Sequence, residues 1–316
     1  MTRALLEVKD LTKHFNTPRG VLAAVDGVTF SIQEGKTLGI VGESGCGKST
    51  TGRAILRLIE PTSGSVYFNG QDVAKFNMKQ MRQARKDMQI IFQDPFSSLD
   101  PRKTVSQIIS EPLKVHKLCK SKGEQEERVL ELMKVVGLAE RLYNSYPHEL
   151  DGGRRQRIGI ARALAVNPKF IVCDEPVSAL DVSIQAQILN LLKELQDKMG
   201  LTYLFITHDL SVVNHFSDDI AVMYLGRVVE KAPAEELFDN PLHPYTKALL
   251  SAIPIPNLKK RKQKIVLKGE VTAPINLPNE CRFSKRCNYV CEACKAKEPP
   301  LVEVSPNHFV ACALIG

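Results

Sequence analysis

A phosphate-binding pattern stands near the N-terminus of this chain. Residues 42–50 read GESGCGKST, which matches G-x-x-x-x-G-K-[ST], and they follow the apolar run 37–41 and precede a helix-like stretch. Glycine can adopt backbone conformations closed to other residues, so successive N–H groups can point at phosphate oxygens at a helix N-terminus. Lys48 would then reach the β and γ phosphates, and Ser49 would ligate Mg²⁺. The nucleotide-binding candidates in this loop are Gly42, Glu43, Ser44, Gly45, Cys46, Gly47, Lys48, Ser49 and Thr50.

A second chemical signal is a pair of carboxylates at the end of an apolar run, FIVCDE at residues 170–175. In open α/β folds, ligands bind at the C-terminal edge of the sheet, where such a strand delivers its acids. Asp174 would hold Mg²⁺, directly or through water. Glu175 points elsewhere and suits a general base that polarises the attacking water. Alone, two acids at a strand end more often cap the next helix, but the upstream phosphate-binding pattern favours catalysis.

The elements that must position these residues are those of an α/β protein. Strands are expected at residues 5–8, 21–30, 65–68 and 88–92, and a helical pattern covers residues 105–136. Helices near 154–165 and 184–199 then alternate with strands at 170–173 and 202–207, which predicts parallel strands flanked by helices. Residues 219–231 predict a hairpin around Gly226. A proline-rich stretch follows, and we place the domain boundary at about residue 255.

Composition indicates a globular chain of 316 residues, with 43% hydrophobic and 25% charged residues. The net charge of +8 would suit nucleic acid or an anionic membrane surface, but no aromatic-interleaved basic motif accompanies it. No apolar run approaches the length that spans a bilayer, and the first ten residues are unlike a signal peptide, so a cytosolic location is expected. Much of the excess charge is local and is typical of a solvated linker: Lys259, Lys260, Arg261, Lys262, Lys264 and Lys268.

Four further segments resemble the motifs of ABC transporter ATPases. Gln93 in IFQDP resembles the Q-loop glutamine, and residues 178–181, SALD, resemble the D-loop. His208 in ITHD is similar to the switch histidine, and Phe15 matches the aromatic position that stacks on adenine. The segment NPLHPYT at residues 240–246, followed by a cysteine-rich tail, resembles more narrowly the ATP-binding subunits of oligopeptide/dipeptide ABC importers. This resemblance covers nearly the whole chain.

The resemblance implies an ABC-type P-loop ATPase with a RecA-like core, an antiparallel β subdomain and a helical subdomain at about 105–165. It assigns residues 1–255 to the ATP-binding domain and residues 256–316 to a small cysteine-rich C-terminal extension. The implied catalytic residues are Lys48, Gln93, Glu175 and His208, and the implied Mg²⁺ ligands are Ser49, Gln93 and Asp174. Phe15 and Gln93 join the loop residues as implied ATP-binding residues.

One motif departs from the family pattern. The signature, normally LSGGQ, is here Leu150, Asp151, Gly152, Gly153 and Arg154. In the family this segment grips the γ-phosphate held by the other subunit of a dimer, so a carboxylate there is electrostatically unfavourable. Arg154 could offset some of this by pairing with Asp151 or with the phosphate. We expect an asymmetric heterodimer in which a partner's intact signature completes this chain's site; the alternative is a tolerated variant with a rearranged loop.

The cysteines of the tail predict a metal site. The chain has eight cysteines and no recognisable secretory signal, which favours metal or redox chemistry over disulfides. Cys281, Cys287, Cys294 and Cys312 match the four positions that the peptide-importer family carries, where they resemble iron–sulfur ligands. Four thiolates suit either [4Fe–4S] or tetrahedral Zn²⁺, and the pair Cys291 and Cys294 keeps zinc open. A small tail with little core would need such a metal to hold its shape.

The expected function is that of an ATPase subunit, using ATP and Mg²⁺, of an importer of dipeptides or oligopeptides at the cytoplasmic face of the cell membrane. Its expected partners are a second homologous ATPase, two membrane permeases that dock on residues 105–149, and an extracytoplasmic peptide-binding protein; no nucleic acid is expected. Alternatives are a soluble ABC-fold ATPase acting on nucleic acid or ribosomes, an importer of another substrate such as a nickel chelate, and a redox sensor in which ATP is only regulatory.

Overall fold

The computed structural model describes residues 4–253, 265–269 and 273–315. The chain forms two compact units, one made of Met1–Ala74 with Phe205–Gly316 and the other of Lys75–Leu204. The boundary predicted near residue 255 lies outside the described residues, and so do Lys259, Lys260, Arg261, Lys262 and Lys264. Within the described part of the chain, no helix combines the length and apolar character needed to cross a membrane.

The first unit begins with an antiparallel sheet. Its strands are β1 (Ala4–Thr17), β2 (Gly20–Gln33), β4 (Ser63–Phe68) and β5 (Gln71–Asp72), in the order β2-β1-β4-β5. Leu6, Val8 and Leu11 of β1 are buried, while polar residues between them face outward. Such alternation is typical of an antiparallel sheet with one face on a core. The three strands expected here from the sequence are confirmed, and β1 and β2 are longer than expected.

The first unit also contains strands in the order β11-β12-β10-β9-β3. They span Val302–Ser305 (β11), His308–Val310 (β12), Arg227–Pro233 (β10), Asp219–Tyr224 (β9) and Thr37–Val41 (β3). β3 runs parallel to β9, and every residue of β3 is buried. The hairpin predicted around Gly226 joins β9 to β10, with positive φ angles of 42° at Leu225 and 85° at Gly226. The two strands of the tail were not predicted.

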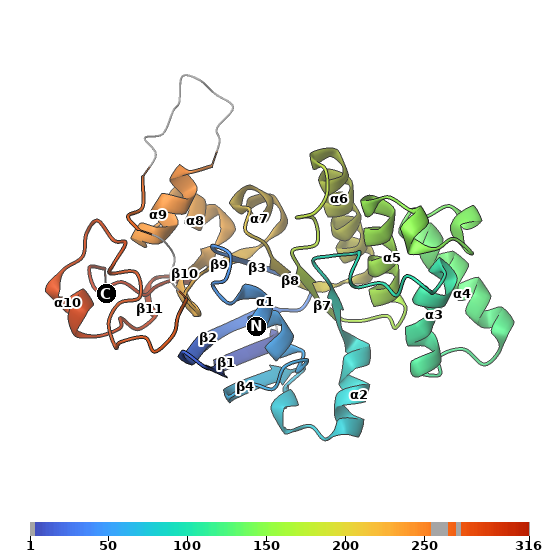
Figure 1. Cartoon of the computed structure of the whole chain (residues 1–316), viewed down its shortest axis with the longest axis horizontal. Helices are drawn as coiled ribbons and strands as arrows, with labels where there is room; N and C mark the ends of the chain where they lie inside the picture. The colour runs from blue at the N-terminus through green and yellow to red at the C-terminus, as the bar shows by residue number, and fades with distance from the viewer. Residues whose placement is uncertain (1–3, 254–264, 270–272, 316) are drawn as a thin grey trace. The chain divides into compact units, whose positions relative to one another are not determined.

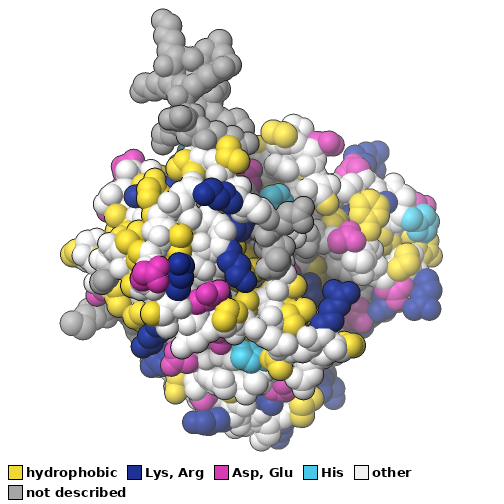
Figure 2. Space-filling view, turned by 60° about the vertical axis from the view of Figure 1, so that its left-hand side comes forward, with side chains coloured by type: hydrophobic (Ala, Val, Ile, Leu, Met, Phe, Trp, Pro, Cys, Tyr) yellow, Lys and Arg dark blue, Asp and Glu magenta, His cyan; other side chains and the backbone are white. Residues whose placement is uncertain are grey.

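In its described residues, the first unit has the helices α1 (Lys48–Ile55), α7 (Leu210–Phe216), α8 (Ala234–Asp239), α9 (Pro244–Ser251) and α10 (Glu292–Ala296). α1 leaves the phosphate loop directly after β3 and packs on β1 and β2. Figure 1 shows α8 and α9 side by side, and α10 in the red tail with β11. In Figure 2, basic, acidic and hydrophobic side chains are interspersed on the face that is drawn.

The second unit holds the parallel pair β6 (Met88–Ile91) and β7 (Phe170–Asp174). Its helices are α2 (Met78–Asp87), α3 (Val105–Val115), α4 (Lys122–Val135), α5 (Gly152–Leu164) and α6 (Val182–Met199). α3, α4 and α5 pack on one another (Figure 1). The helical pattern expected over 105–136 is two helices, because Lys117 takes a left-handed conformation (φ 53°) and Ser121 caps a new helix through the N–H of Glu124.

The remaining strand, β8 (Thr202–Ile206), contains the residue at which the chain passes from the second unit back to the first. All five of its residues are buried, as are those of β7. Continuous burial is typical of parallel strands that are covered on both faces. The acids at the end of β7 and the histidine after β8 therefore follow rigid, fully packed strands.

Candidate ATP-hydrolysis site

The backbone of the phosphate loop takes a conformation that requires glycine at two positions. Gly42 has φ 153° and Gly47 has φ 105°, both in the range that side-chain-bearing residues rarely adopt. A Cβ at Gly42 would lie 2.2 Å from the carbonyl oxygen of Met223, and a Cβ at Gly47 would lie 2.0 Å from that of Ala24. Both distances are steric clashes with backbone, so the two glycines are needed for the loop to close against β2 and β9.

The lysine of the loop is folded back onto the loop itself. Lys48 is 4% exposed, and its Nζ donates to the carbonyl oxygens of Gly42 at 2.8 Å and Glu43 at 3.1 Å. Ser49 and Thr50 follow it in the first turn of α1 and are half-buried. Cys46 is buried, and desolvation raises the pKa of its thiol, so it packs as a small neutral residue. The ammonium group therefore lies beside the first two residues of the loop.

The aromatic and switch candidates also belong to the first unit. Phe15 lies in β1 opposite Leu22, half-buried, with the Lys13 ammonium 4.9 Å from its ring centroid. His208 is exposed directly after β8, where the backbone N–H of Thr207 donates to the carbonyl oxygen of Ile40 in β3. Asp209 then caps α7 through the N–H of Ser211. His208 therefore lies between the end of a strand and the start of a helix.

In the second unit, the structure brings Gln93 and Glu175 together. The Gln93 amide donates to the Glu175 carboxylate, with Nε2 and Oε2 3.0 Å apart. Asp174, the last residue of β7, is fully buried, whereas Glu175 is partly exposed. Glu175 has a left-handed backbone (φ 47°), and its carbonyl oxygen accepts a hydrogen bond from the Ser178 hydroxyl. Strained backbone of this kind is common at functional sites, because the surrounding structure must hold it in place.

The unusual signature, residues 150–154, forms the N-terminus of α5. The Asp151 carboxylate caps α5 by accepting from the Arg154 N–H at 2.8 Å. The Arg154 guanidinium pairs with the same carboxylate at 3.4 Å, as the sequence suggested it could. A Cβ at Gly152 would lie 3.0 Å from Leu180 and one at Gly153 would lie 2.7 Å from Ile184, so both glycines pack closely. Asp151 therefore performs locally the capping that a serine hydroxyl performs.

Contacts between α5 and the residues after Gln93 were not expected from the sequence. The Arg155 guanidinium lies 3.8 Å from the centroid of the Phe96 ring, which is 61% exposed. Arg162, also on α5, donates to the carbonyl oxygen of Ser98 at 2.7 Å. These two arginines join the signature helix to the Q-loop segment. The sequence positions of the two arginines do not predict these contacts, because the partner residues are about sixty positions away.

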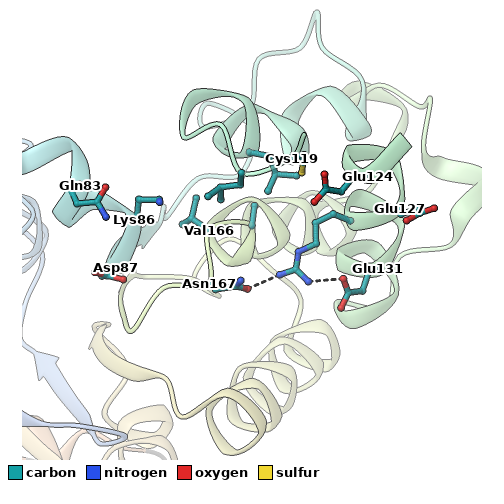
Figure 3. A pocket seen from close by; sticks show the side chains of 13 residues that line it. Gln83, Lys86, Asp87, Cys119, Glu124, Glu127, Glu131, Val166 and Asn167 are labelled. Atoms are coloured by element: carbon teal, nitrogen blue, oxygen red, sulfur yellow. Dashed lines mark hydrogen bonds and ion pairs between the residues drawn. The ribbon is translucent and has the colours of Figure 1, made fainter. Parts of the chain in front are cut away.

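A cavity of about 660 Å³ lies elsewhere in the second unit (Figure 3). Arg128 lines this cavity and donates hydrogen bonds to the side-chain oxygens of Glu131 and Asn167, each at 2.6 Å. Glu124 and Glu127 of α4 also line it. None of the residues that line it is a nucleotide-site candidate, so this cavity is separate from the predicted ATP site.

The cysteines of the tail are free thiols that differ in burial. Cys281, Cys294 and Cys312 are buried and Cys287 is half-buried. Burial raises the pKa of Cys281 to about 12, with Cys294 and Cys312 acting in the same direction. The sulfurs of Cys291 and Cys294 are 3.4 Å apart. No group of three or more His, Cys, Asp or Glu side chains in the described residues is placed to hold a metal ion, so the ligand set stays a prediction.

The candidates are divided between the two units. The first unit contains the phosphate loop, the aromatic candidate and the switch histidine; the second contains the Q-loop, the paired acids and the signature. The predicted Mg²⁺ ligands draw on both units and stay a prediction, as do the nucleotide contacts. The predicted ligands of that site are a hydroxyl, an amide and a carboxylate, which are oxygen donors of the kind that Mg²⁺ prefers: Ser49, Gln93 and Asp174.

Comparisons with known proteins show the family and the fold of this chain. The family described as ABC transporter matches residues 25–178, and the C-terminal region of oligopeptide/dipeptide transporters matches residues 229–294. Among solved structures, the dimeric bacterial ABC transporter cassette MJ0796 is 33% identical, with a TM-score of 0.67, covering 72% of this chain and 98% of its own. The cbiO1 protein of Clostridium perfringens is 30% identical, with a TM-score of 0.66, covering 75% of this chain and 91% of its own.

Curated relatives match over nearly the whole length. The oligopeptide transport ATP-binding proteins AppF and OppF of Bacillus subtilis are 52% and 54% identical, over 98% and 99% of this chain and 97% of each relative. A putative peptide import ATP-binding protein of Brucella ovis is 51% identical, over 98% of this chain and 97% of its own length. The chain therefore belongs to the ATP-binding subunits of oligopeptide/dipeptide ABC transporters, enzymes that hydrolyse ATP to drive transport.

Proposed function

We propose that this chain hydrolyses ATP to drive the import of dipeptides or oligopeptides through two membrane permeases, at the cytoplasmic face of the cell membrane. The observation that carries the ATPase part is the hydrogen bond between Gln93 and Glu175 beside the buried Asp174. The names of the relatives support the peptide substrate. An extracytoplasmic peptide-binding protein would deliver the substrate to the permeases.

In this proposal Glu175 is the general base. Its carboxylate would accept a proton from the water that attacks the γ-phosphate, and Gln93 would orient that carboxylate until nucleotide arrives. Lys48 would move from its loop carbonyls to the β and γ phosphates. Mg²⁺, held by Ser49, Gln93 and Asp174, would neutralise charge on the phosphate oxygens. His208 would contact the γ-phosphate and report its presence.

The test of the substrate is uptake by the assembled transporter in proteoliposomes. With ATP inside and a labelled tripeptide presented with the binding protein, we expect ATP-dependent accumulation of the peptide. A labelled nickel chelate serves as the competing substrate. Accumulation of the chelate, and not of the peptide, would replace the peptide assignment and leave the ATPase assignment intact.

The proposal includes an asymmetric pair of ATPases. Asp151 places a carboxylate where the family has a serine, and its pairing with Arg154 supports a signature of altered chemistry. A partner with an intact signature would complete the site built on this chain's phosphate loop. Lys48→Ala in this chain should then abolish most turnover, while the equivalent change in the partner should cost less. Equal losses from both changes would indicate a functionally symmetric dimer.

The proposal also places a metal in the tail, on Cys281, Cys287, Cys294 and Cys312. Support comes from the soft thiol donors, the burial of three of them, and the backbone hydrogen bond from the Cys281 N–H to the Cys294 carbonyl oxygen at 2.8 Å. A bound [4Fe–4S] cluster or Zn²⁺ would cross-link these segments. Protein purified without oxygen should be brown and contain iron and acid-labile sulfide in about equal amounts. Colourless protein with one Zn²⁺ would establish zinc instead, and metal-free protein would remove the centre.

A further inference from the structure

The second residue of the phosphate loop, Glu43, is held by the C-terminal extension. The Arg286 guanidinium donates to both oxygens of the Glu43 carboxylate, at 2.6 Å from Nη1 and 3.1 Å from Nη2. The Arg286 side chain is 9% exposed and that of Glu43 is 28% exposed. Such a two-pronged, largely desolvated pair is among the stronger and more directional polar interactions in proteins. It links two residues that are 243 positions apart.

The backbone of Glu43 is held from the same side. Its N–H donates to the Tyr245 hydroxyl at 3.0 Å, and Tyr245 is fully buried. Its carbonyl oxygen accepts from the Lys48 ammonium at 3.1 Å. The carboxylate, the N–H and the carbonyl of this one residue therefore each have a fixed partner, and two of the three partners lie C-terminal to residue 240. The position of the loop next to Lys48 thus depends on residues outside the phosphate-binding motif.

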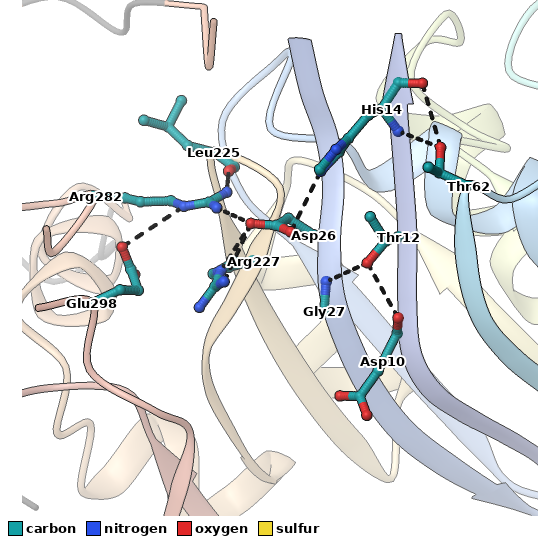
Figure 4. Close-up of polar contacts among 10 residues, drawn as sticks. All are labelled: Asp10, Thr12, His14, Asp26, Gly27, Thr62, Leu225, Arg227, Arg282 and Glu298. Atoms are coloured by element: carbon teal, nitrogen blue, oxygen red, sulfur yellow. Dashed lines mark hydrogen bonds and ion pairs between the residues drawn. The ribbon is translucent and has the colours of Figure 1, made fainter. Parts of the chain in front are cut away.

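The segment that carries Arg286 packs against other parts of the first unit. The Phe283 ring packs against those of Tyr224 and Tyr245, at centroid distances of 5.3 Å and 5.4 Å. Arg282 reaches the carboxylate of Asp26 in β2 and the carbonyl oxygen of Leu225 (Figure 4). Although burial favours the neutral acid, the neighbouring Arg282 and Arg227 keep the pKa of Asp26 below its ordinary value. The segment is therefore a packed element against which the loop is fixed.

Charge gives this contact a role in ATP binding. Glu43 directly follows Gly42, at the start of a loop that must accept the negative phosphates, and a carboxylate without a counter-ion there would repel them. Its charge would also hold the Lys48 ammonium on the loop. Arg286 supplies the compensating positive charge in a fixed place. The arginine lies beside Cys287, so the cysteine-rich segment carries the group that neutralises the loop.

We propose that Arg286 is a positioning residue for ATP. By neutralising and orienting Glu43, this residue of the C-terminal extension contributes to phosphate binding. The inference rests on the ATPase activity of the family and not on the peptide substrate. It predicts an effect on nucleotide affinity that is larger than the effect on the chemical step. It also predicts that the need for Arg286 disappears when Glu43 carries no charge.

The experiment is a double-mutant cycle on the full chain, read by binding of a fluorescent ATP analogue and by ATPase kinetics of the assembled transporter. Arg286→Ala should raise both the Kd for the analogue and the KM for ATP by about 10- to 100-fold, with kcat at saturating ATP changed less than about threefold. Adding Glu43→Gln should bring Kd and KM back to within about threefold of wild type, because no unpaired charge then remains. Arg102→Ala is the matched control, since it breaks an exposed two-pronged pair with Asp100.

A conservative pair of variants keeps the test decisive if Arg286→Ala does not fold. Arg286→Lys retains the charge and loses the planar fork, so it should raise Kd by about 3- to 10-fold when Glu43 is present. In the Glu43→Gln background, where the partner is a neutral amide, the same change should raise Kd less than about twofold. The inference is overturned if Arg286→Ala leaves Kd within about twofold of wild type, or if Glu43→Gln recovers nothing in either background. Wild-type protein that binds ATP without transporting peptide would refute the substrate assignment alone.

Discussion

The Asp151–Arg154 pair leads to a prediction about charge in the signature. Arg154→Gln removes the positive group that pairs with the Asp151 carboxylate, while the capping hydrogen bond from the backbone N–H at residue 154 can remain. The carboxylate would then face a partner's γ-phosphate without compensation. We therefore expect this single change to lower ATP turnover at the site that this signature completes, and to lower it more than a change that also removes Asp151.

The magnitude follows from the geometry. Two unit charges about 4 Å apart repel by about 4 kcal/mol at an effective dielectric near 20. The Asp151 and Arg154 side chains are 60% and 49% exposed, so solvent screens much of this. We take about 1–2 kcal/mol, which for Arg154→Gln corresponds to a loss of about 5- to 30-fold in the turnover of the site that this signature completes. Asp151→Ser combined with Arg154→Gln should equal or exceed wild type, and its unfolding free energy should stay within about 0.5 kcal/mol, because serine caps as well as aspartate.

The assay is steady-state ATPase activity of the reconstituted transporter in a Lys48→Ala background, where the remaining turnover would come from the site that this signature completes. Thermal unfolding is measured on the same variants. Arg141→Gln is the control, because Arg141 lines the same cavity of about 330 Å³ as Asp151 and Arg154. It removes the same charge, but the Asp151 carboxylate keeps its ion pair with Arg154. If Arg154→Gln leaves this remaining activity within about twofold of the Lys48→Ala protein, or if the double variant lowers it, charge in the signature does not govern turnover at this site.

Three further outcomes are expected. Glu175→Gln should retain ATP binding and lower turnover by about 10²- to 10⁴-fold, and near-normal hydrolysis would remove Glu175 from the mechanism. His308→Ala should destabilise the protein by about 3 kcal/mol, a fall of roughly 5–10 °C in Tm, because the fully buried Glu230 carboxylate would lose the imidazole that lies 2.8 Å away. As a control, replacement of the exposed His215 by alanine should not shift Tm. Equal shifts from the two changes would contradict the argument. Gly47→Ala should abolish binding of a fluorescent ATP analogue, because its Cβ would clash with a backbone carbonyl of β2, and unchanged binding would show that the loop tolerates the strain.

Local patterns predicted much of this structure. The apolar runs before the phosphate loop and before the paired acids are strands, and the hairpin around Gly226 is present because Leu225 and Gly226 both take positive φ angles. The pairing of Arg154 with Asp151 was also open to prediction, because residues three apart share one face of a helix. Each of these features depends on neighbours that are close in the sequence.

Contacts between distant segments could not be predicted in this way. Nothing in the spacing of the chain places Arg286 on Glu43 or His308 on Glu230, since each pair forms only after separate elements have packed. The two strands of the tail were missed for the same reason: β11 and β12 are short, and β12 gains its partners from β10. Periodicity reports which face of a segment is apolar and not which other segment will cover it.

The pairing of β12 with β10 has a consequence for self-association. Glu230 and Lys231 of β10 oppose Val310 and Phe309 of β12, so the tail occupies the hydrogen-bonding edge of β10. A chain shortened before the tail would leave that edge open, with unpaired N–H and carbonyl groups available to a second molecule. It would also leave the Glu230 carboxylate without its histidine. The extension therefore covers the edge of β10 with β12 and β11, and we expect the shortened chain to aggregate by strand addition.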